Sequence, residues 1–155
     1  MLEAGLGIGN PAPGVRTIVG DIRDLPLPDR AFDVVWCRLV LGHLPELGAA
    51  YAELARVAGD GATVIVSDFH PAAYEAGHRR TFRADGAVHE VAHHVHRVVD
   101  HSTAAAAAGL DPVDVRIGLV GSEVRSFYEA AGRLALYHEQ RGLPLVLVML
   151  FRGGR

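Results

Sequence analysis

The sequence contains no lysine, one cysteine and one tryptophan. A single cysteine, Cys37, cannot form a disulfide within the chain, which excludes a small secreted scaffold built on disulfides. It also excludes a zinc site built from several thiolates. No apolar run approaches the roughly 20 residues that cross a bilayer, and the first residues lack the basic and apolar stretches of a secretory signal. We therefore expect a cytoplasmic protein with no membrane partner.

Positive charge is also scarce. Arginine supplies all 15 basic side chains against 18 acidic ones, and the net charge is −3. This net charge gives no sign of a basic surface, so we expect no nucleic-acid partner. The 155 residues are 50% hydrophobic and 21% charged, which is typical of one globular domain. We predict a single domain over residues 1–155.

Apolar runs in the first half predict strands. These are residues 15–20 (VRTIVG), 32–37 (FDVVWC) and 62–68 (ATVIVSD). Between the last two, apolar side chains recur at helical spacing from Leu47 to Val57, after Pro45. This alternation predicts an α/β fold with a mainly parallel sheet. Because the strands are apolar on both faces, we expect flanking helices on both sides of the sheet.

The second half shows a different pattern. Asp85-Gly86 between two extended stretches predicts a hairpin, and an alanine-rich helix is expected over residues 102–109. Residues 113–120 and 143–151 read as strands. Ser126 and Glu129 have the spacing of a capping box, which predicts a helix from there up to Gly142.

In open parallel sheets, ligands bind beyond the carboxyl ends of the strands. The residues after the three first strands are Gly20 to Ile22, then Cys37 and Arg38, then residues 67–70 (SDFH). An acidic side chain there can accept hydrogen bonds from a ribose hydroxyl or an exocyclic amine. Spacing alone therefore predicts a cleft for a small molecule at this edge.

Residues 20–71 carry an ordered set of motifs. They are the GD-x-x-x-LP-x-P segment, the FD-V-V strand, the L-x-HLP-E turn, the A-x-x-EL-x-RV helix and the V-I-V-S-D strand. Gly59-Asp60-Gly61 precedes the last of these. Together they resemble the middle of a class I S-adenosylmethionine-dependent methyltransferase, of the methyltransferase type 11 kind. The rest of the chain, from Tyr74 to Phe151, resembles the substrate-side half of such enzymes.

The resemblance implies a Rossmann-like methyltransferase fold whose last strand is antiparallel. Residues 15–71 would be the methyltransferase core, and residues 72–155 the substrate-side half, with the hairpin as a lid over the carboxyl end of the sheet. It also implies S-adenosylmethionine as cofactor and a small-molecule methyl acceptor. The implied cofactor-binding residues are Asp21, which would contact the adenine amine, the Ile22 amide, Cys37 and Arg38. Alternatively, Asp21 is a solvated loop residue and Cys37 a buried apolar one.

Two histidines are implied on the substrate side. His43 matches a histidine of the family's turn, and its alternative role is to cap or pack the following helix. His70, with Ser67 and Asp68, would face the acceptor cleft and act as a general base, because an unperturbed histidine titrates near neutrality. The alternative for His70 is a surface loop residue.

The family's first strand, glycine-rich loop and second strand should precede Val15. Residues 5–9 (GLGIG) offer glycines, but the sequence predicts no strand before them, so they read as plain loop. We therefore expect a truncated methyltransferase that binds S-adenosylmethionine weakly or not at all. The alternative is a non-catalytic or repurposed binding or assembly module. An uncovered strand at residues 32–37 predicts a homodimer, or else a heteromeric partner.

Five histidines lie close together in the second half, at positions 89, 93, 94, 96 and 101. If residues 88–96 form a strand, His94 and His96 share one face and His89 and His93 the other. No third ligand is identifiable, so we predict no metal site. The nearby arginines at positions 79, 80 and 83 read as a solvated face that could steer an anionic substrate.

Overall fold

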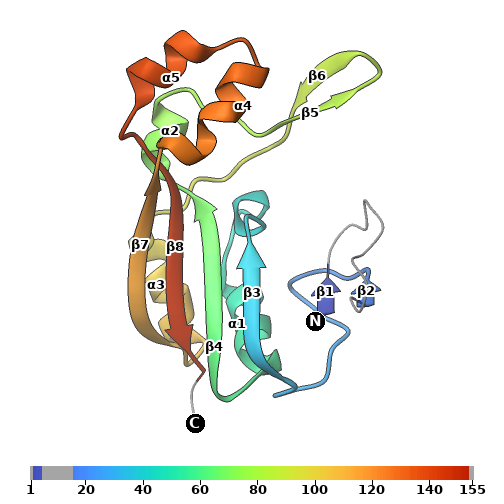
Figure 1. Ribbon diagram of the computed structural model, residues 1–155. Coiled ribbons are helices and arrows are strands. Elements are labelled where there is room, and N and C mark those ends of the chain that lie inside the picture. The colour runs from blue at the N-terminus through green and yellow to red at the C-terminus, as the bar shows by residue number, and fades with distance from the viewer. Residues whose placement is uncertain (1, 5–15, 154–155) are drawn as a thin grey trace.

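The computed structural model describes residues 2–4 and 16–153, and a four-stranded sheet forms its centre (Figure 1). The strands lie in the order β3 (Phe32–Arg38), β4 (Ala58–Phe69), β8 (Pro144–Arg152) and β7 (Asp111–Leu119). β3 and β4 are parallel, and β8 is antiparallel to both of its neighbours, so β7 runs in the same direction as β3 and β4. The α/β fold class and the antiparallel last strand are confirmed.

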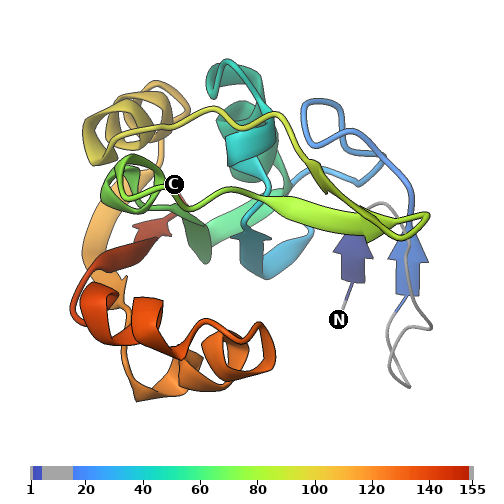
Figure 2. The ribbon, with the colours of Figure 1, turned by 90° about the horizontal axis from the view of Figure 1, so that it is seen from above.

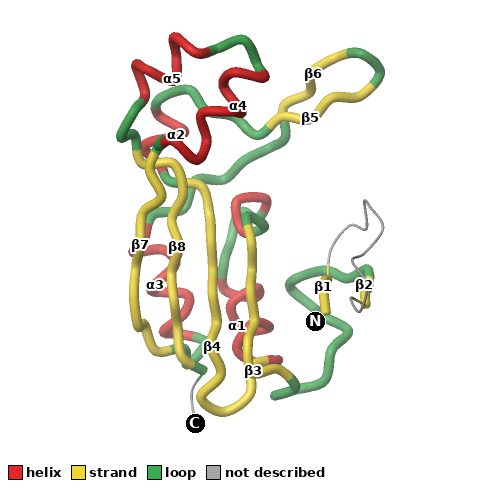
Figure 3. The backbone as a smooth tube through the Cα atoms, viewed as in Figure 1, coloured by secondary structure: helices red, strands yellow, loops and turns green. Residues whose placement is uncertain are grey.

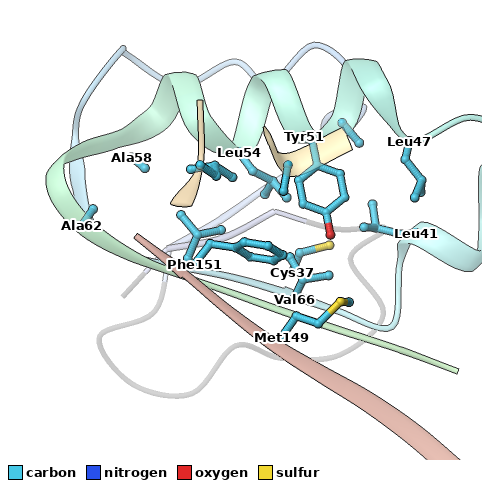
Figure 4. Packing of buried hydrophobic residues seen from close by; sticks show 14 of the residues in the cluster. Cys37, Leu41, Leu47, Tyr51, Leu54, Ala58, Ala62, Val66, Met149 and Phe151 are labelled. Carbon is cyan, nitrogen blue, oxygen red and sulfur yellow. The ribbon is translucent and has the colours of Figure 1, made fainter. Parts of the chain in front are cut away.

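Helices α1 (Gly48–Val57) and α3 (Val98–Ala107) cover one face of this sheet (Figure 2). Their apolar sides meet the alternate strand residues that point toward them, and the ring of Tyr51 packs edge-on against that of Phe151 (Figure 4). Val64 and Val66 of β4 are fully buried in the same layer. The main hydrophobic core therefore lies between the sheet and these two helices.

The opposite face is open. Val34 and Trp36 of β3 are 61% and 60% exposed there. α4 (Arg125–Ala130) and α5 (Leu134–Gln140) lie on this side, but beyond the end of the strands (Figures 1 and 2). The expectation of helices over both faces is therefore wrong for the described residues, although the strand sequences are apolar on both.

The N-terminal strands stand apart from this sheet. β2 (Arg16–Ile18), inside the predicted strand 15–20, pairs in parallel with β1 (Leu2–Ala4) and, among the described residues, not with β3. The expectation that no strand comes before residues 5–9 is wrong, because β1 does. The loop predicted for those residues lies outside the described part of the chain.

Helix boundaries in the second half differ from the predictions. α3 begins at Val98 rather than Ser102, because Asp100 accepts a hydrogen bond from the backbone of Arg97. Ser126 makes no capping bond and lies inside α4, and the predicted single helix is broken at Gly132, which has φ of 66°. The short helices are η1 (Leu41–His43), α2 (Pro71–Glu75) and η2 (Ser122–Val124). Among the described residues, no helix combines the length and apolarity needed to cross a membrane.

The hairpin lies where the sequence predicts it. β5 (Thr81–Ala84) and β6 (Ala87–Glu90) are antiparallel, and the turn residues Asp85 and Gly86 have φ of 51° and 76°. It projects beyond the carboxyl ends of β3 and β4, and an irregular segment, residues 91–97, leads from it to α3 (Figures 1 and 3). Its role as a lid stays a prediction.

Candidate functional site

The carboxyl ends of β3 and β4 bring together a set of polar side chains. Asp68, near the end of β4, is 1% exposed. Its Oδ1 accepts a hydrogen bond from the Phe69 amide at 2.8 Å and one from Arg80 Nη2 at 3.0 Å. Burial raises the pKa of this carboxyl, and the Arg80 guanidinium opposes that shift. A buried carboxylate with a fixed cation beside it is the centre of the candidate site.

Arg80, directly before β5, joins three parts of the chain. Its Nη1 donates to the carbonyl of Leu39, just after β3, and lies 3.0 Å from Nε2 of His43. Its own carbonyl accepts from the Val91 amide at 2.9 Å. The guanidinium therefore links the ends of β3 and β4 to the flank of the hairpin. The expectation that Arg80 belongs to a solvated face is wrong, because its side chain is 15% exposed.

His43 ends η1 on the exposed side of this cluster. Burial and the neighbouring Arg80 charge lower the pKa of His43, while a hydrogen bond to the backbone of Ala92 opposes them. Since a guanidinium only donates, Nε2 of His43 must accept, which leaves the proton of the neutral ring on Nδ1. The structure thus places the predicted His43 in the site and favours one tautomer.

A second histidine lies beneath the carboxylate. His101 of α3 is fully buried, with Nδ1 3.1 Å from the Tyr51 hydroxyl and Nε2 3.6 Å from Oδ2 of Asp68. Burial, assisted by nearby His96, lowers the pKa of His101 to about 4. The ring is therefore neutral at pH 7, and the hydroxyl of Tyr51 can donate to Nδ1 while Nε2–H faces Asp68.

His70 lies at the start of α2 rather than in this cluster. Its Nδ1 accepts a hydrogen bond from the Ala72 amide at 3.1 Å, as an N-cap side chain does. The neutral ring then carries its proton on Nε2. In this structure His70 caps helix α2, and its proposed role as a base stays a prediction.

The predicted cofactor residues are dispersed. Both carboxylate oxygens of Asp21 bind Arg23, at 2.6 Å to Nη2, and this contact lowers the pKa of Asp21 to about 2. Ile22 is half-buried against the core. With Asp21 occupied in this way, the residues present do not fit an adenine amine unless Arg23 moves.

Cys37 and Arg38 point to opposite sides of β3. Cys37 is buried under α1, and burial raises the pKa of its thiol to about 12, so this residue packs as an apolar side chain. Arg38 is exposed, with its guanidinium 5.7 Å from the centre of the Trp36 ring. Of these two residues, only Arg38 is therefore accessible to a ligand.

The histidine cluster does not form the predicted strand. β6 ends at Glu90, so alternation stops there, and His93 and His96 are shielded while His94 is exposed. Among the described residues, no three acidic, histidine or cysteine side chains come close enough to hold a metal ion. The site therefore consists of Asp68, Arg80 and His43, with His93 beside them.

Sequence reasoning did not assign Arg80, His101 or Tyr51 to this site. Asp68 was noticeable because it follows a buried strand, but its partners come from elements that the sequence does not connect to it. An arginine beside the hairpin and a histidine within an alanine-rich helix give no local pattern. A buried acidic side chain requires hydrogen-bonding or cationic partners. That requirement was the one signal in the sequence that pointed to a partner for Asp68.

Comparisons with known proteins agree with this architecture. Residues 3–66 match the family model of a methyltransferase domain, Methyltransf_11. The malonyl-[acyl-carrier protein] O-methyltransferase of Serratia marcescens is 42% identical over 50 residues, which are 32% of this chain and 20% of that protein. The ajmaline N-methyltransferase of Rauvolfia serpentina is 44% identical over 48 residues, 31% of this chain and 16% of that protein. These matches thus span a fifth or less of either relative.

The fold gives an independent comparison. A crystal structure of an S-adenosylmethionine-dependent methyltransferase from Mesorhizobium loti superimposes with a TM-score of 0.61 at 18% identity, over 92% of this chain and 71% of that one. The family match over residues 3–66 and the fold together confirm the resemblance to the class I S-adenosylmethionine-dependent methyltransferase family.

Proposed function

We propose that this chain carries the methyl-acceptor side of an S-adenosylmethionine-dependent methyltransferase that acts on a small molecule. The observation that supports this most is the Asp68, Arg80 and His43 cluster at the carboxyl ends of β3 and β4. That edge is where open α/β sheets bind ligands. The relatives that match in sequence are named as O- and N-methyltransferases, which is consistent with an acceptor that bears oxygen or nitrogen.

The chain's own contribution would be orientation and proton handling. S-adenosylmethionine supplies an already activated methyl group, so such proteins mainly position the acceptor. His43 and His70 are the proposed catalytic side chains. Each has its lone pair occupied, His43 by Arg80 and His70 by the Ala72 amide. Both would first orient an acceptor, and either becomes a base only after it leaves its present partner.

Cofactor binding by the 155-residue chain is proposed to be weak. The candidate contacts are Asp21, the Ile22 amide and Arg38, with a smaller part for the backbone near Cys37. Asp21 is already paired with Arg23. A ligand must displace that pair before the Asp21 carboxylate can accept a hydrogen bond from it.

Nuclear magnetic resonance titration of the chain with S-adenosylmethionine tests this function. We expect amide shifts at Ile22 and Arg38 that saturate only at millimolar ligand, and tighter binding in Arg23→Ala, which frees Asp21. The matched control is Arg125→Ala, because Arg125 pairs with Glu129 on a distant helix. A low micromolar dissociation constant would contradict weak binding. If no shifts appear at these amides, the chain has no cofactor function of its own.

The second candidate is a binding or assembly module, and the exposed strand β3 favours it. Among the described residues β3 pairs only with β4, and Val34 and Trp36 are exposed beside its free edge. Apolar, β-branched edges readily pair with another chain. We propose that a second copy covers this strand and gives a symmetric homodimer.

Light scattering tests the homodimer. We expect twice the mass of one chain, and a monomer for Trp36→Glu. Phe82→Glu is the matched control, since Phe82 is another exposed aromatic residue but lies on the hairpin. Because Trp36 is the only tryptophan, its fluorescence emission should shift to shorter wavelength as the dimer forms. A monomer at high concentration would contradict the homodimer and leave a heteromeric partner as the alternative.

A further inference from the structure

Arg80 and His43 form a contact that the sequence does not suggest. The two residues are far apart in the chain, yet Nη1 of Arg80 lies 3.0 Å from Nε2 of His43. A cation next to an imidazole normally repels its protonated form. Such a pair persists only where other groups hold the cation in place.

Two such groups hold the guanidinium, and a third holds the backbone of Arg80. Asp68 Oδ1 accepts from Nη2 at 3.0 Å, and the Leu39 carbonyl accepts from Nη1. The backbone carbonyl of Arg80 is itself fixed by the Val91 amide. Because Asp68 is almost fully buried, its charge cannot be satisfied by water. Among residues 2–4 and 16–153, Arg80 is the cation within hydrogen-bonding distance of it.

The backbone at this point is also under constraint. Leu39, whose carbonyl receives the Arg80 hydrogen bond, has φ of 55°. This left-handed conformation is unusual for a bulky side chain and persists where the surroundings over-determine it. Gly42 contributes as well, because a methyl group there would lie 3.1 Å from Asp68 Oδ1 and 3.2 Å from Arg80 Nη2. The turn after β3 is therefore shaped around the guanidinium.

We propose that Arg80, anchored by Asp68, is a positioning residue that holds His43 as the neutral Nδ1–H tautomer at the acceptor side of the site. This inference rests on the proposed function. In that state Nε2 of His43 is reserved as an acceptor, and the ring cannot take up a proton until Arg80 moves away. Displacement of Arg80, for example by an acceptor with its own anionic group, makes the lone pair of His43 available.

Other charged and titratable groups also face His43. Asp68 reaches it from β4 and favours its charged form, while Arg80 opposes that form. A charge on His43 in turn lowers the pKa of the neighbouring His93. His94, in the same segment as His93, donates its amide to the carbonyl of Gly42, the residue before His43. Of these groups, Arg80 is the one within hydrogen-bonding distance of the imidazole nitrogen.

The test is a titration of the His43 ring by nuclear magnetic resonance in the full 155-residue chain. For the unmodified protein we expect the Nδ1–H tautomer and a pKa below the ordinary value of about 6.5. In Arg80→Met we expect the pKa of His43 to rise toward its ordinary value and the tautomer to become mixed. Arg80→Lys tests the positive charge separately from the forked shape of the guanidinium. A lysine side chain keeps the charge but cannot reach Asp68, Leu39 and His43 together.

Arg79→Met is the matched control. Arg79 is adjacent, but its guanidinium lies over the ring of Tyr74 and near Glu90, away from His43. The His43 titration should be unchanged in this variant. An unchanged His43 pKa and tautomer in Arg80→Met, with the rest of the spectrum native-like, would overturn the proposal. If Arg80→Met fails to fold, the tautomer and pKa in Arg80→Lys decide the question. The measurement uses no cofactor, so its outcome is separate from that of the S-adenosylmethionine titration.

Discussion

The two faces of the four-stranded sheet carry similar side chains in very different surroundings. Val64 of β4 and Phe151 of β8 are paired in register and completely covered by α1 and α3. Val34 and Trp36, one strand away, are about 60% exposed on the other face. Alternation along a strand sends neighbours to opposite faces, so composition alone does not reveal which face is covered. Burial, rather than apolarity, determines what each side chain contributes to stability.

Truncation of a large side chain on each face tests this comparison and has the largest expected effect. Phe151→Ala should lower the free energy of unfolding by about 3–5 kcal/mol, because it leaves a cavity beneath α1. Trp36→Ala should lower it by less than about 1 kcal/mol. Urea denaturation with an unchanged slope would measure both values. An equally large loss for Trp36→Ala would mean that the open face is covered in solution, in agreement with the homodimer.

The covered side of the sheet also contains the polar cluster, and Gly42 tests how tightly it is packed. Gly42→Ala would place a methyl group 3.1 Å from both Asp68 Oδ1 and His93 Cε1. We expect a loss of about 1–3 kcal/mol, because Asp68 and Arg80, which both neighbour the new methyl group, are hydrogen-bonded to each other and cannot both withdraw. Gly48→Ala is the matched control, since nothing lies within 4 Å of its new methyl group. Equal stability of the two variants in thermal unfolding would show that the cluster is loosely packed.

Much of this architecture is predictable from the sequence, and the reasons are local. The strands of the central sheet follow from β-branched apolar runs, and the hairpin from Asp85-Gly86. The antiparallel direction of the last strand followed from the resemblance. The start of α3 was missed because Arg97 and Asp100 cap it, a pairing that propensity does not indicate. The spacing of Ser126 and Glu129 matched a capping box, but the chain was already helical at Arg125.

The candidate site was predictable only in part. Asp68 and His43 were identified because each follows a strand or stands in a recognisable turn. Arg80 was assigned to a solvated face because its role depends on a contact between segments far apart in the chain. The histidines at 93 and 96 were placed by strand alternation, which fails because β6 ends at Glu90. Sequence periodicity locates elements, whereas buried polar contacts depend on how those elements pack.

The histidines on the covered side of the sheet predict how the free energy of unfolding changes with pH. Burial lowers the pKa of His93 and of His101 to about 4. Between pH 6.5 and about 4 the unfolded chain binds protons that the folded chain does not, so stability is complete above this window and falls as the pH falls through it. Asp68, whose pKa is raised, acts in the opposite direction and offsets part of the loss. We expect a net loss on the order of 2 kcal/mol on acidification.

Urea denaturation at pH 7 and pH 5 measures this loss. Both ring nitrogens of His93 are buried and have no hydrogen-bond partner within the described part of the chain. His93→Phe should therefore reduce the pH dependence, because the apolar ring need not be protonated on unfolding. This variant should therefore be more stable than the unmodified protein at pH 5. An identical pH dependence in the variant would show that His93 is solvated, contrary to its place on the covered side.

The smallest expected effect concerns the turn that separates the two faces at the end of β3. Leu39 has φ of 55° and is 38% exposed, so Leu39→Gly relieves a strained backbone at the expense of a partly buried side chain and a more flexible unfolded chain. These contributions nearly cancel, and we expect a change of less than about 1 kcal/mol. Arg38→Gly is the matched control, because Arg38 has ordinary strand geometry and its replacement brings the entropic cost without any relief. If chemical denaturation shows Leu39→Gly to be the more destabilised of the two, the backbone at Leu39 is not strained, and Arg80 does not hold its carbonyl in a constrained turn.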